Sequence, residues 1–275
     1  MKKNIIAILF ISNYFLQAQS PAITSWLQNT TITGNYYPKT GPVALTPNNI
    51  LVNCQSVQYT ANHVYVSTKG IPAYPVGPYL DNNPNQAGNQ NAIFKFPLAP
   101  VQNTGTPVST SLGNIAVFIN GVAAFDAKDG MSWKSSTSAW AGGPLGGTGD
   151  GVWQRDAIVY ERAGFDCAKG HPAGTNYHHH QNPSAFKNDI TIISTVCATY
   201  NSDGLYSINP LQHSPLIGFA YDGFPIYGAY AYKNTDGTGG GAGGTESNVE
   251  HGRGGGAGDS PPAVACRLPL GVCPD

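Results

Sequence analysis

The stretch Ile115-Ala116-Val117-Phe118-Ile119-Asn120-Gly121-Val122 gives the clearest structural signal in the chain. Its apolar, partly β-branched first half predicts a buried strand, and the Asn-Gly pair predicts a turn directly after it. Asn-Gly favours the type I′ turn, because both central residues of that turn need a positive φ angle. We therefore expect a β-hairpin here, built around a type I′ turn.

Other segments extend the same pattern. Residues 63–67 alternate as a half-buried strand does, residues 190–196 read as a buried strand, and residues 217–227 read as two strands of a hairpin. Residues 70–91 hold four prolines and predict a long loop. The segment 156–162 fits either a short helix or a strand.

The composition agrees with a mainly β fold. The 275 residues include 34 glycines and 21 prolines, and only 11% are charged, against about 25% in most soluble proteins. We expect one β-rich, sandwich-like domain over residues 19–275, with long Gly/Pro-rich loops and a flexible Gly-rich insertion at 236–260. The net charge of −1 offers no basic patch, which excludes nucleic acid as a partner.

The N-terminus resembles a secretory signal peptide. Lys2 and Lys3 precede a mostly apolar run at 5–16, and the small residue Ala18 offers a cleavage site after residue 18. The apolar run is too short to span a bilayer, and no later run approaches transmembrane length. We expect a secreted or periplasmic protein whose partners are extracellular small molecules or polymers.

Export would place the five cysteines where disulfides form. Cys266 and Cys273 suit a small terminal loop, which leaves Cys167 and Cys197 as the other local pair. The odd number leaves at least one cysteine outside such pairs. The sequence alone does not fix the connectivity.

Histidines gather in one short segment. Four of the seven histidines of the chain lie within ten residues: His171, His178, His179 and His180. Pro172 and Pro183 exclude a helix through the ends of this segment, so an extended strand is expected. Such a cluster can be a solvated surface, but its density in an exported protein favours a site.

Strand alternation divides the cluster into two faces. His178 and His180 should point one way, and Tyr177 and His179 the other. Two imidazoles on one face form a workable pair of ligands for a transition metal such as zinc or copper. The third ligand is expected to be His171 or His213.

Two carboxylates are candidates to assist this site. Asp222 lies in an Asp-Gly turn, so its role is that of a turn residue, of an acceptor that orients a histidine ring, or of both. Asp166 is the other candidate orienting group or general base. A further hypothesis, in which Cys167 beside His171 is a nucleophile, is less favoured, because an exported cysteine more often forms a disulfide.

These motifs together resemble the YHYH-domain family of secreted proteins. The resemblance covers about residues 110–230 and rests on motifs that occur in the family's order. They are Asn120-Gly121-Val122, Phe125-Asp126, Phe165-Asp166-Cys167, Gly170-His171-Pro172, residues 177–180 and residues 217–228. One departure is His179, which replaces the second tyrosine of the family motif. The resemblance implies a signal peptide and an extracellular or periplasmic β-rich domain, and it leaves the reaction open.

Three classes of function remain after this reading. The first is a secreted metal-binding protein that uses His178 and His180 with His171 or His213. The second is a metal-dependent hydrolase on an extracellular substrate, with Asp222 or Asp166 as its general base. The third is a glycan- or peptide-binding module with aromatic stacking surfaces, although most of the aromatic residues are expected in the core.

Overall fold

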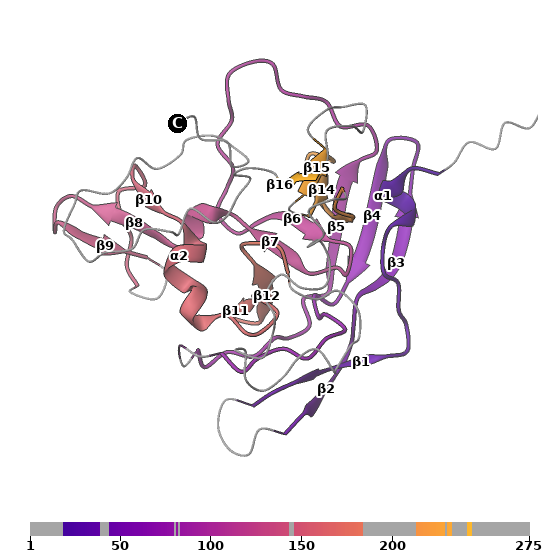
Figure 1. Cartoon of the computed structure of the whole chain (residues 1–275), viewed down its shortest axis with the longest axis horizontal. Helices are drawn as coiled ribbons and strands as arrows, with labels where there is room; N and C mark the ends of the chain where they lie inside the picture. The colour runs from indigo at the N-terminus through magenta and orange to yellow at the C-terminus, as the bar shows by residue number, and fades with distance from the viewer. Residues whose placement is uncertain are drawn as a thin grey trace, which may run out of the picture.

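The structure, a computed structural model, describes residues 19–38, 44–79, 81, 83–142, 146–183, 213–228, 230–232 and 241–243. These residues form a mainly β molecule with several sheets and few, short helices (Figure 1). No helix in this part of the chain is long and apolar enough to cross a membrane. The predicted signal peptide, the predicted strand at 190–196 and Cys197, Cys266 and Cys273 lie outside the described residues.

The largest sheet has six strands in the order β11-β12-β7-β6-β13-β14. Its strands are β6 (Asn114–Phe118), β7 (Ala123–Phe125), β11 (His171–Ala173), β12 (Asn176–His179), β13 (Leu216–Ala220) and β14 (Pro225–Tyr227). All neighbours are antiparallel except β12 and β7, which pair in parallel. This parallel pairing joins the predicted β6–β7 hairpin to the histidine segment.

A second sheet, β3-β4-β5, packs on the first. Its strands are the antiparallel neighbours β3 (Cys54–Tyr59), β4 (His63–Thr68) and β5 (Ala92–Pro97). Val64 and Val66 of β4 are fully buried while their neighbours are partly exposed, which confirms the predicted alternation. With Phe96 they form a core with Val117 and Phe219 of the six-stranded sheet. The sandwich-like arrangement therefore rests on this apolar contact between two sheets.

Smaller elements surround these two sheets. They are β1 (Thr33–Tyr36) with β2 (Thr46–Leu51); β8 (Met131–Lys134) with β9 (Ala139–Ala141) and β10 (Gln154–Arg155); β15 (Tyr230–Tyr232) with β16 (Gly241–Gly243); helices α1 (Pro21–Thr24) and α2 (Ala157–Glu161); and 3₁₀ turns η1 (Ala127–Asp129) and η3 (Arg162–Gly164). The sheet β9-β8-β10 projects from the body beside α2 (Figure 1). Three residues of the expected flexible insertion form β16, and most of that insertion lies outside the described residues.

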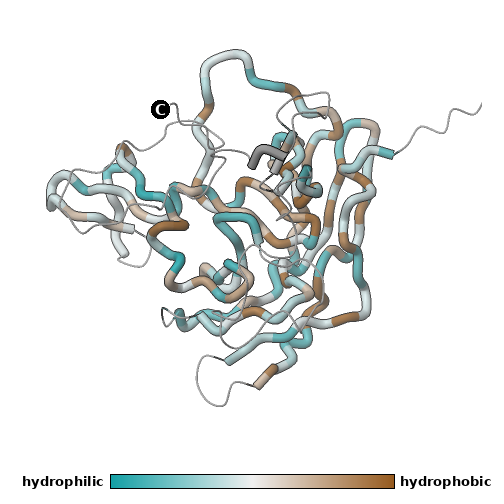
Figure 2. The backbone as a smooth tube through the Cα atoms, viewed as in Figure 1, coloured by the Kyte–Doolittle hydropathy of each residue, from teal (hydrophilic) through white to brown (hydrophobic). Residues whose placement is uncertain are grey.

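The predicted loop at 70–91 has no helix or extended strand among its described residues. It is nevertheless part of a core, because Ile71, Tyr74 and Val76 are almost fully buried and pack with Val122 and Tyr177. Hydrophobic residues also follow the central strands, whereas the outer loops are mostly polar or neutral (Figure 2). The loop thus lies directly against strand β12.

The ambiguous segment 156–162 contains helix α2. The Asp156 side chain accepts a hydrogen bond from the Ile158 N–H at 2.8 Å, which is the N-cap interaction that favours helix over strand. The sequence carries this signal as an aspartate directly before the apolar run. The helix brings Glu161 toward the six-stranded sheet.

The β6–β7 hairpin is present, but the predicted type I′ turn is wrong. Gly121 has a φ angle of +77°, whereas Asn120 is not among the residues with positive φ. The Gly121 N–H donates to the Phe118 carbonyl, and the Phe118 N–H donates to the Val122 carbonyl. This is a type I turn followed by a glycine bulge. The buried Asn120 side chain accepts from the Val122 N–H at 3.2 Å, which stabilises this alternative turn.

We predict that Gly121→Ala destabilises the protein by more than about 2 kcal/mol, because it combines left-handed strain with overpacking. A Cβ at this position would lie 2.3 Å from Thr68 Oγ1. Gly174 is the matched control, since its φ is +58° and nothing lies within 4 Å of an added Cβ. Gly174→Ala should cost only about 1 kcal/mol, from strain alone. Urea unfolding measures both, and equal losses would contradict the packing argument.

Candidate metal centre

The β11–β12 hairpin brings two of the predicted histidines together. Gly174 allows the tight turn between the strands with its positive φ angle, and the register pairs His171 directly with His178. Residues opposite each other in an antiparallel pair project from the same face of the sheet. Their ring centroids lie 4.6 Å apart. No hairpin was predicted at this position. His171 was therefore a candidate because it is close to His178 in the sequence, and not because the two residues were expected to pair.

Alternation along β12 adds the third histidine. His180 follows the last residue of the strand, and its Nε2 atom lies 3.2 Å from Nε2 of His178. Tyr177 and His179 point to the opposite face, where their rings pack together. The structure therefore places these four side chains as the alternation predicts.

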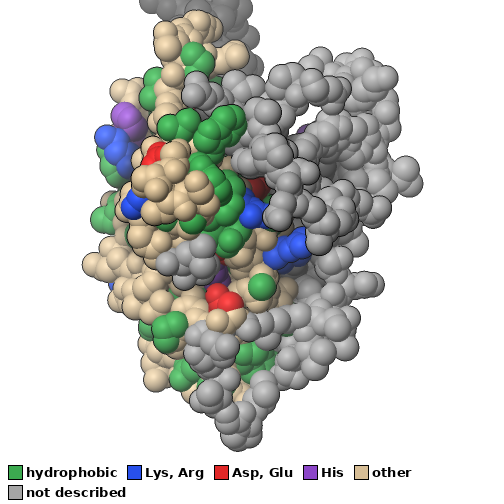
Figure 3. All heavy atoms as spheres, turned by 90° about the vertical axis from the view of Figure 1, so that its left-hand side faces the viewer, with side chains coloured by type: hydrophobic (Ala, Val, Ile, Leu, Met, Phe, Trp, Pro, Cys, Tyr) green, Lys and Arg blue, Asp and Glu red, His purple; other side chains and the backbone are tan. Residues whose placement is uncertain are grey.

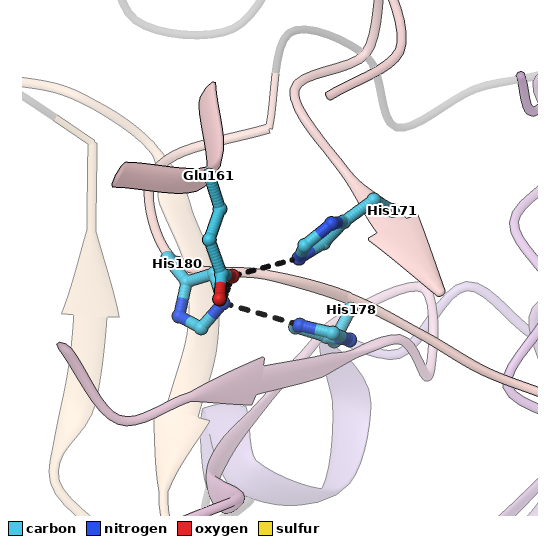
Figure 4. Close-up of side chains that lie close together, drawn as sticks. All are labelled: Glu161, His171, His178 and His180. Carbon is cyan, nitrogen blue, oxygen red and sulfur yellow. Dashed lines mark hydrogen bonds and ion pairs between the residues drawn. The ribbon is translucent and has the colours of Figure 1, made fainter. Parts of the chain in front are cut away.

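Helix α2 supplies a carboxylate that the sequence analysis missed. Oε2 of Glu161 lies 3.2 Å from Nε2 of His171 and 3.1 Å from Nε2 of His180. One donor atom from each of Glu161, His171, His178 and His180 lies within 4.8 Å of all the others (Figure 4). The available signal was an acidic residue at the end of an N-capped helix shortly before the histidine motif.

Several ring nitrogens in this cluster have no hydrogen-bond partner. Nδ1 of His171 and Nδ1 of His180 are buried with no hydrogen-bond partner, and Nε2 of His171 has only the ion-pair contact with Glu161 Oε2. Buried polar atoms are nearly always satisfied in proteins, and a cation at Nε2 of His171 would supply one such partner. Nδ1 of His178 lies 3.0 Å from the Asn176 carbonyl, an acceptor, so Nδ1 carries the proton. Nε2 of His178 then keeps a free lone pair that points into the cluster.

Aromatic rings enclose the cluster. The Phe125 ring stacks on His178 with centroids 3.7 Å apart, and it meets His180 edge-on. Phe165 meets His171 edge-on at 4.9 Å. The side chains of Glu161 and His171 are each only 10% exposed, and that of His180 is fully buried. Water has little access to these donors, which strengthens any electrostatic interaction among them.

The electrostatics favour the protonation states that a metal requires. Burial alone would raise the pKa of Glu161, but the contacts with His171 and His180 outweigh it and lower the pKa to about 2. Burial, together with the nearby His180 and His171 rings, holds the pKa of His178 well below its usual value. An ionised carboxylate and a neutral imidazole are therefore present at neutral pH, and both are metal-ligand forms.

The opposite face of β12 anchors the strand in the core. Nε2 of His179 lies 2.8 Å from the Tyr74 hydroxyl, and Nδ1 lies 2.9 Å from the Lys169 carbonyl. The carbonyl can only accept, so Nδ1 donates to it and the hydroxyl donates to Nε2. Burial lowers the pKa of His179 to about 3. His179 is a neutral, fully satisfied core residue.

Asp166 belongs to this anchoring face and not to the metal cluster. Its carboxylate accepts hydrogen bonds from the Tyr177 hydroxyl and from the N–H groups of Gly77, Ala168 and Gly170. Complete burial raises its pKa to about 7, although these hydrogen bonds oppose the rise. The expected role of Asp166 as a group that orients the histidine pair therefore finds no contact to support it.

His213 and Asp222 also lie outside the cluster. His213 is exposed, its ring packs edge-on against Tyr227 at 4.9 Å, and its Nδ1 lies 2.7 Å from the Ser214 carbonyl. Asp222 is exposed and accepts from the Phe224 N–H at 3.3 Å, which is the turn role considered for it. His213 is not part of the cluster that could hold a metal, whereas Glu161 is, because the β13–β14 hairpin pairs with β6 on the far side of β7 from β12.

The four donors fit a transition metal. In a tetrahedral site with bonds of about 2.0–2.1 Å, neighbouring donors are about 3.3–3.4 Å apart. The three distances of 3.1–3.2 Å in the cluster are close to this spacing. Three imidazoles and one carboxylate are ligands that zinc and copper accept. The four donor atoms, all within 4.8 Å of one another, could hold a metal ion.

Fold and site together define a mainly β protein with a His/Glu cluster between helix α2 and the six-stranded sheet. The sequence profile of the YHYH protein family matches residues 93–261, more than half of the chain. The chain therefore belongs to the YHYH family, which confirms the resemblance seen in the sequence. No curated protein and no solved structure gives a significant match.

We predict that His179 stabilises the fold less as the pH falls. Its pKa is near 3 in the folded protein and about 6.5 in an unfolded chain, so the unfolded state binds the extra proton. The stabilisation is complete above pH 6.5 and is lost as the pH falls toward 3.

The test measures the free energy of unfolding of wild type and of His179→Gln as a function of pH, with chelator present. The difference between the two proteins reports this loss. The comparison cancels the titration of Asp166, which both proteins share. A difference that stays constant from pH 7 to pH 4 would contradict the prediction.

Proposed function

We propose that this YHYH protein binds one zinc ion through His171, His178, His180 and Glu161, and that the ion is a structural cross-link. The observation that carries the proposal is the convergence of four donor atoms within 4.8 Å in a buried, aromatic-walled position. Bound zinc would take the Nε2 atoms of His171, His178 and His180 and join α2 to the β11–β12 hairpin. Copper is the alternative ion for the same donors.

The donor count favours a structural ion over a hydrolytic centre. Structural zinc sites are closed by four protein ligands, whereas catalytic sites keep three and leave a position for water. Glu161 supplies the fourth donor here, and little of the cluster is exposed. A metal-dependent hydrolase would need Glu161 to leave the ion or to act as a general base, so it is the second candidate.

The proposed setting is extracellular or periplasmic. The signal-peptide pattern at residues 1–18 and the family resemblance support export. The proposed disulfides, Cys167 with Cys197 and Cys266 with Cys273, fit the same setting. Among the described residues, Cys54 is buried with a free thiol, and burial raises its pKa strongly, so it is an unreactive core residue.

We predict one zinc per chain in the exported protein, measured by elemental analysis after dialysis. His178→Ala and Glu161→Ala should each abolish stoichiometric metal, because each removes a donor from a closed site. His213→Ala is the matched control and should retain the metal, since His213 lies outside the cluster. Metal that persists in His178→Ala, or that disappears in His213→Ala, would overturn the proposed ligand set.

We also predict that removing the metal with a chelator lowers the melting temperature by about 10 °C, as expected for the loss of a few kcal/mol. Adding zinc back should restore it. The His178→Ala protein should show no further decrease with the chelator, which controls for non-specific effects. An unchanged melting temperature on metal removal would argue for an open, catalytic site instead.

A further inference from the structure

Three of the four tryptophans lie on one small sheet, outside the hydrophobic cores. Trp133 is in β8, Trp140 is in β9, and Trp153 directly precedes β10. Only Trp26 is a core residue, stacked on Phe96. Most aromatic residues were expected in the core, and these three tryptophans are exceptions that need another explanation.

The three tryptophans lie on neighbouring segments of this sheet. Trp133 pairs directly with Trp140, and their rings meet edge-to-face with centroids 5.4 Å apart. The Trp133 N–H donates to the Trp153 carbonyl at 3.0 Å, whereas the Trp133 carbonyl accepts from the Asp150 N–H, so Trp153 lies beside Trp133 at the irregular end of the β8–β10 pair. Directly opposed residues share a face, so Trp133 and Trp140 do. Trp153 adjoins this pair in the neighbouring segment.

This aromatic group, Trp133, Trp140 and Trp153, is accessible at the surface. Trp153 is 42% exposed and its neighbour Val152 is 59% exposed, while Trp133 and Trp140 are partly exposed. Figure 3 shows hydrophobic side chains gathered on the side of the molecule from which β8–β10 project, with Lys or Arg side chains at their edge. The adjoining β8–β9 turn, residues 135–138, holds only serine and threonine. Hydroxyl groups therefore border the aromatic residues, together with the carboxylate of Asp150, which accepts from the Ser135 N–H at 2.7 Å.

A fixed cation completes the surface. The Arg155 guanidinium lies 5.6 Å from the Trp140 ring centroid and 4.8 Å from that of Tyr160. Arg155 is exposed, and in the part of the chain that the structure describes no carboxylate lies within ion-pair distance of it. Stacking between two rings limits its motion and leaves its N–H groups available.

We propose that this aromatic group and Arg155 bind an acidic polysaccharide. The apolar faces of sugar rings stack on indoles, and the hydroxyl groups of the turn suit hydrogen bonds to a glycan. A guanidinium without a carboxylate partner is complementary to the carboxylate of a uronic acid, which it can bind through two hydrogen bonds. The charge of Arg155 selects an acidic glycan over a neutral one. This binding is independent of the metal centre.

The test is retention of the full-length protein in native gels that contain polygalacturonate, with neutral β-glucan gels and phospholipid vesicles as comparisons. Wild type should be retarded by polygalacturonate alone, and less so at high salt. Trp153→Ala and Arg155→Gln should each weaken binding about tenfold, as expected for loss of a stacking or charge-assisted contact. Tyr59→Ala, an exposed aromatic on β3, is the matched control and should bind as wild type does.

Melting temperatures within about 2 °C of wild type establish that each variant is folded. If Trp153→Ala unfolds, Arg155→Gln alone decides the question. Equal retardation by the neutral glucan would overturn the charge argument, and binding to vesicles in place of glycan would assign the aromatic group to a membrane surface. No retardation in either gel, or equal losses in Tyr59→Ala, would remove the proposal.

Discussion

The period-two alternation of strand β12 is the constraint on which the rest of the site depends. One face of the strand carries His178 and, just beyond its end, His180; the other carries Tyr177 and His179. The second face is fixed by contacts with Tyr74 and Asp166 in the core. Because a strand cannot rotate one face without the other, this anchoring also fixes the direction of the imidazoles in the His/Glu cluster.

The sequence predicted most of what depends on local pattern. The alternation of β4, the strand β6, the hairpin at 217–227 and the opposed faces of residues 177–180 all follow from residue type and period. The predicted type I′ turn at Asn120-Gly121 was wrong, because the Asn120 side chain is buried and accepts a hydrogen bond from the Val122 N–H. The type of a turn depends on how its side chains are buried in the folded protein. The preference of an Asn-Gly pair carries no information about that burial.

Which residues belong to the cluster depends on how distant elements meet, and the sequence pattern does not contain this information. Glu161 joins the cluster only because α2 packs beside the β11–β12 hairpin, and no periodicity links a helical glutamate to a strand histidine. Asp222 was favoured because it lies in the second motif of the family, and His213 because it lies just before that motif. The sheet order separates β13 and β14, which carry that motif, from β12 by β6 and β7. The motif therefore lies away from the histidine cluster.

The ligand set has a consequence for the order of folding. All four donors fall between residues 161 and 180, so the loop that must close to bring them together is short. The Tyr74–His179 contact on the other face joins residues 105 positions apart. Contacts between near neighbours form faster than distant ones. An ion captured by the nascent hairpin and helix would therefore act as a folding nucleus, onto which the N-terminal segments later dock.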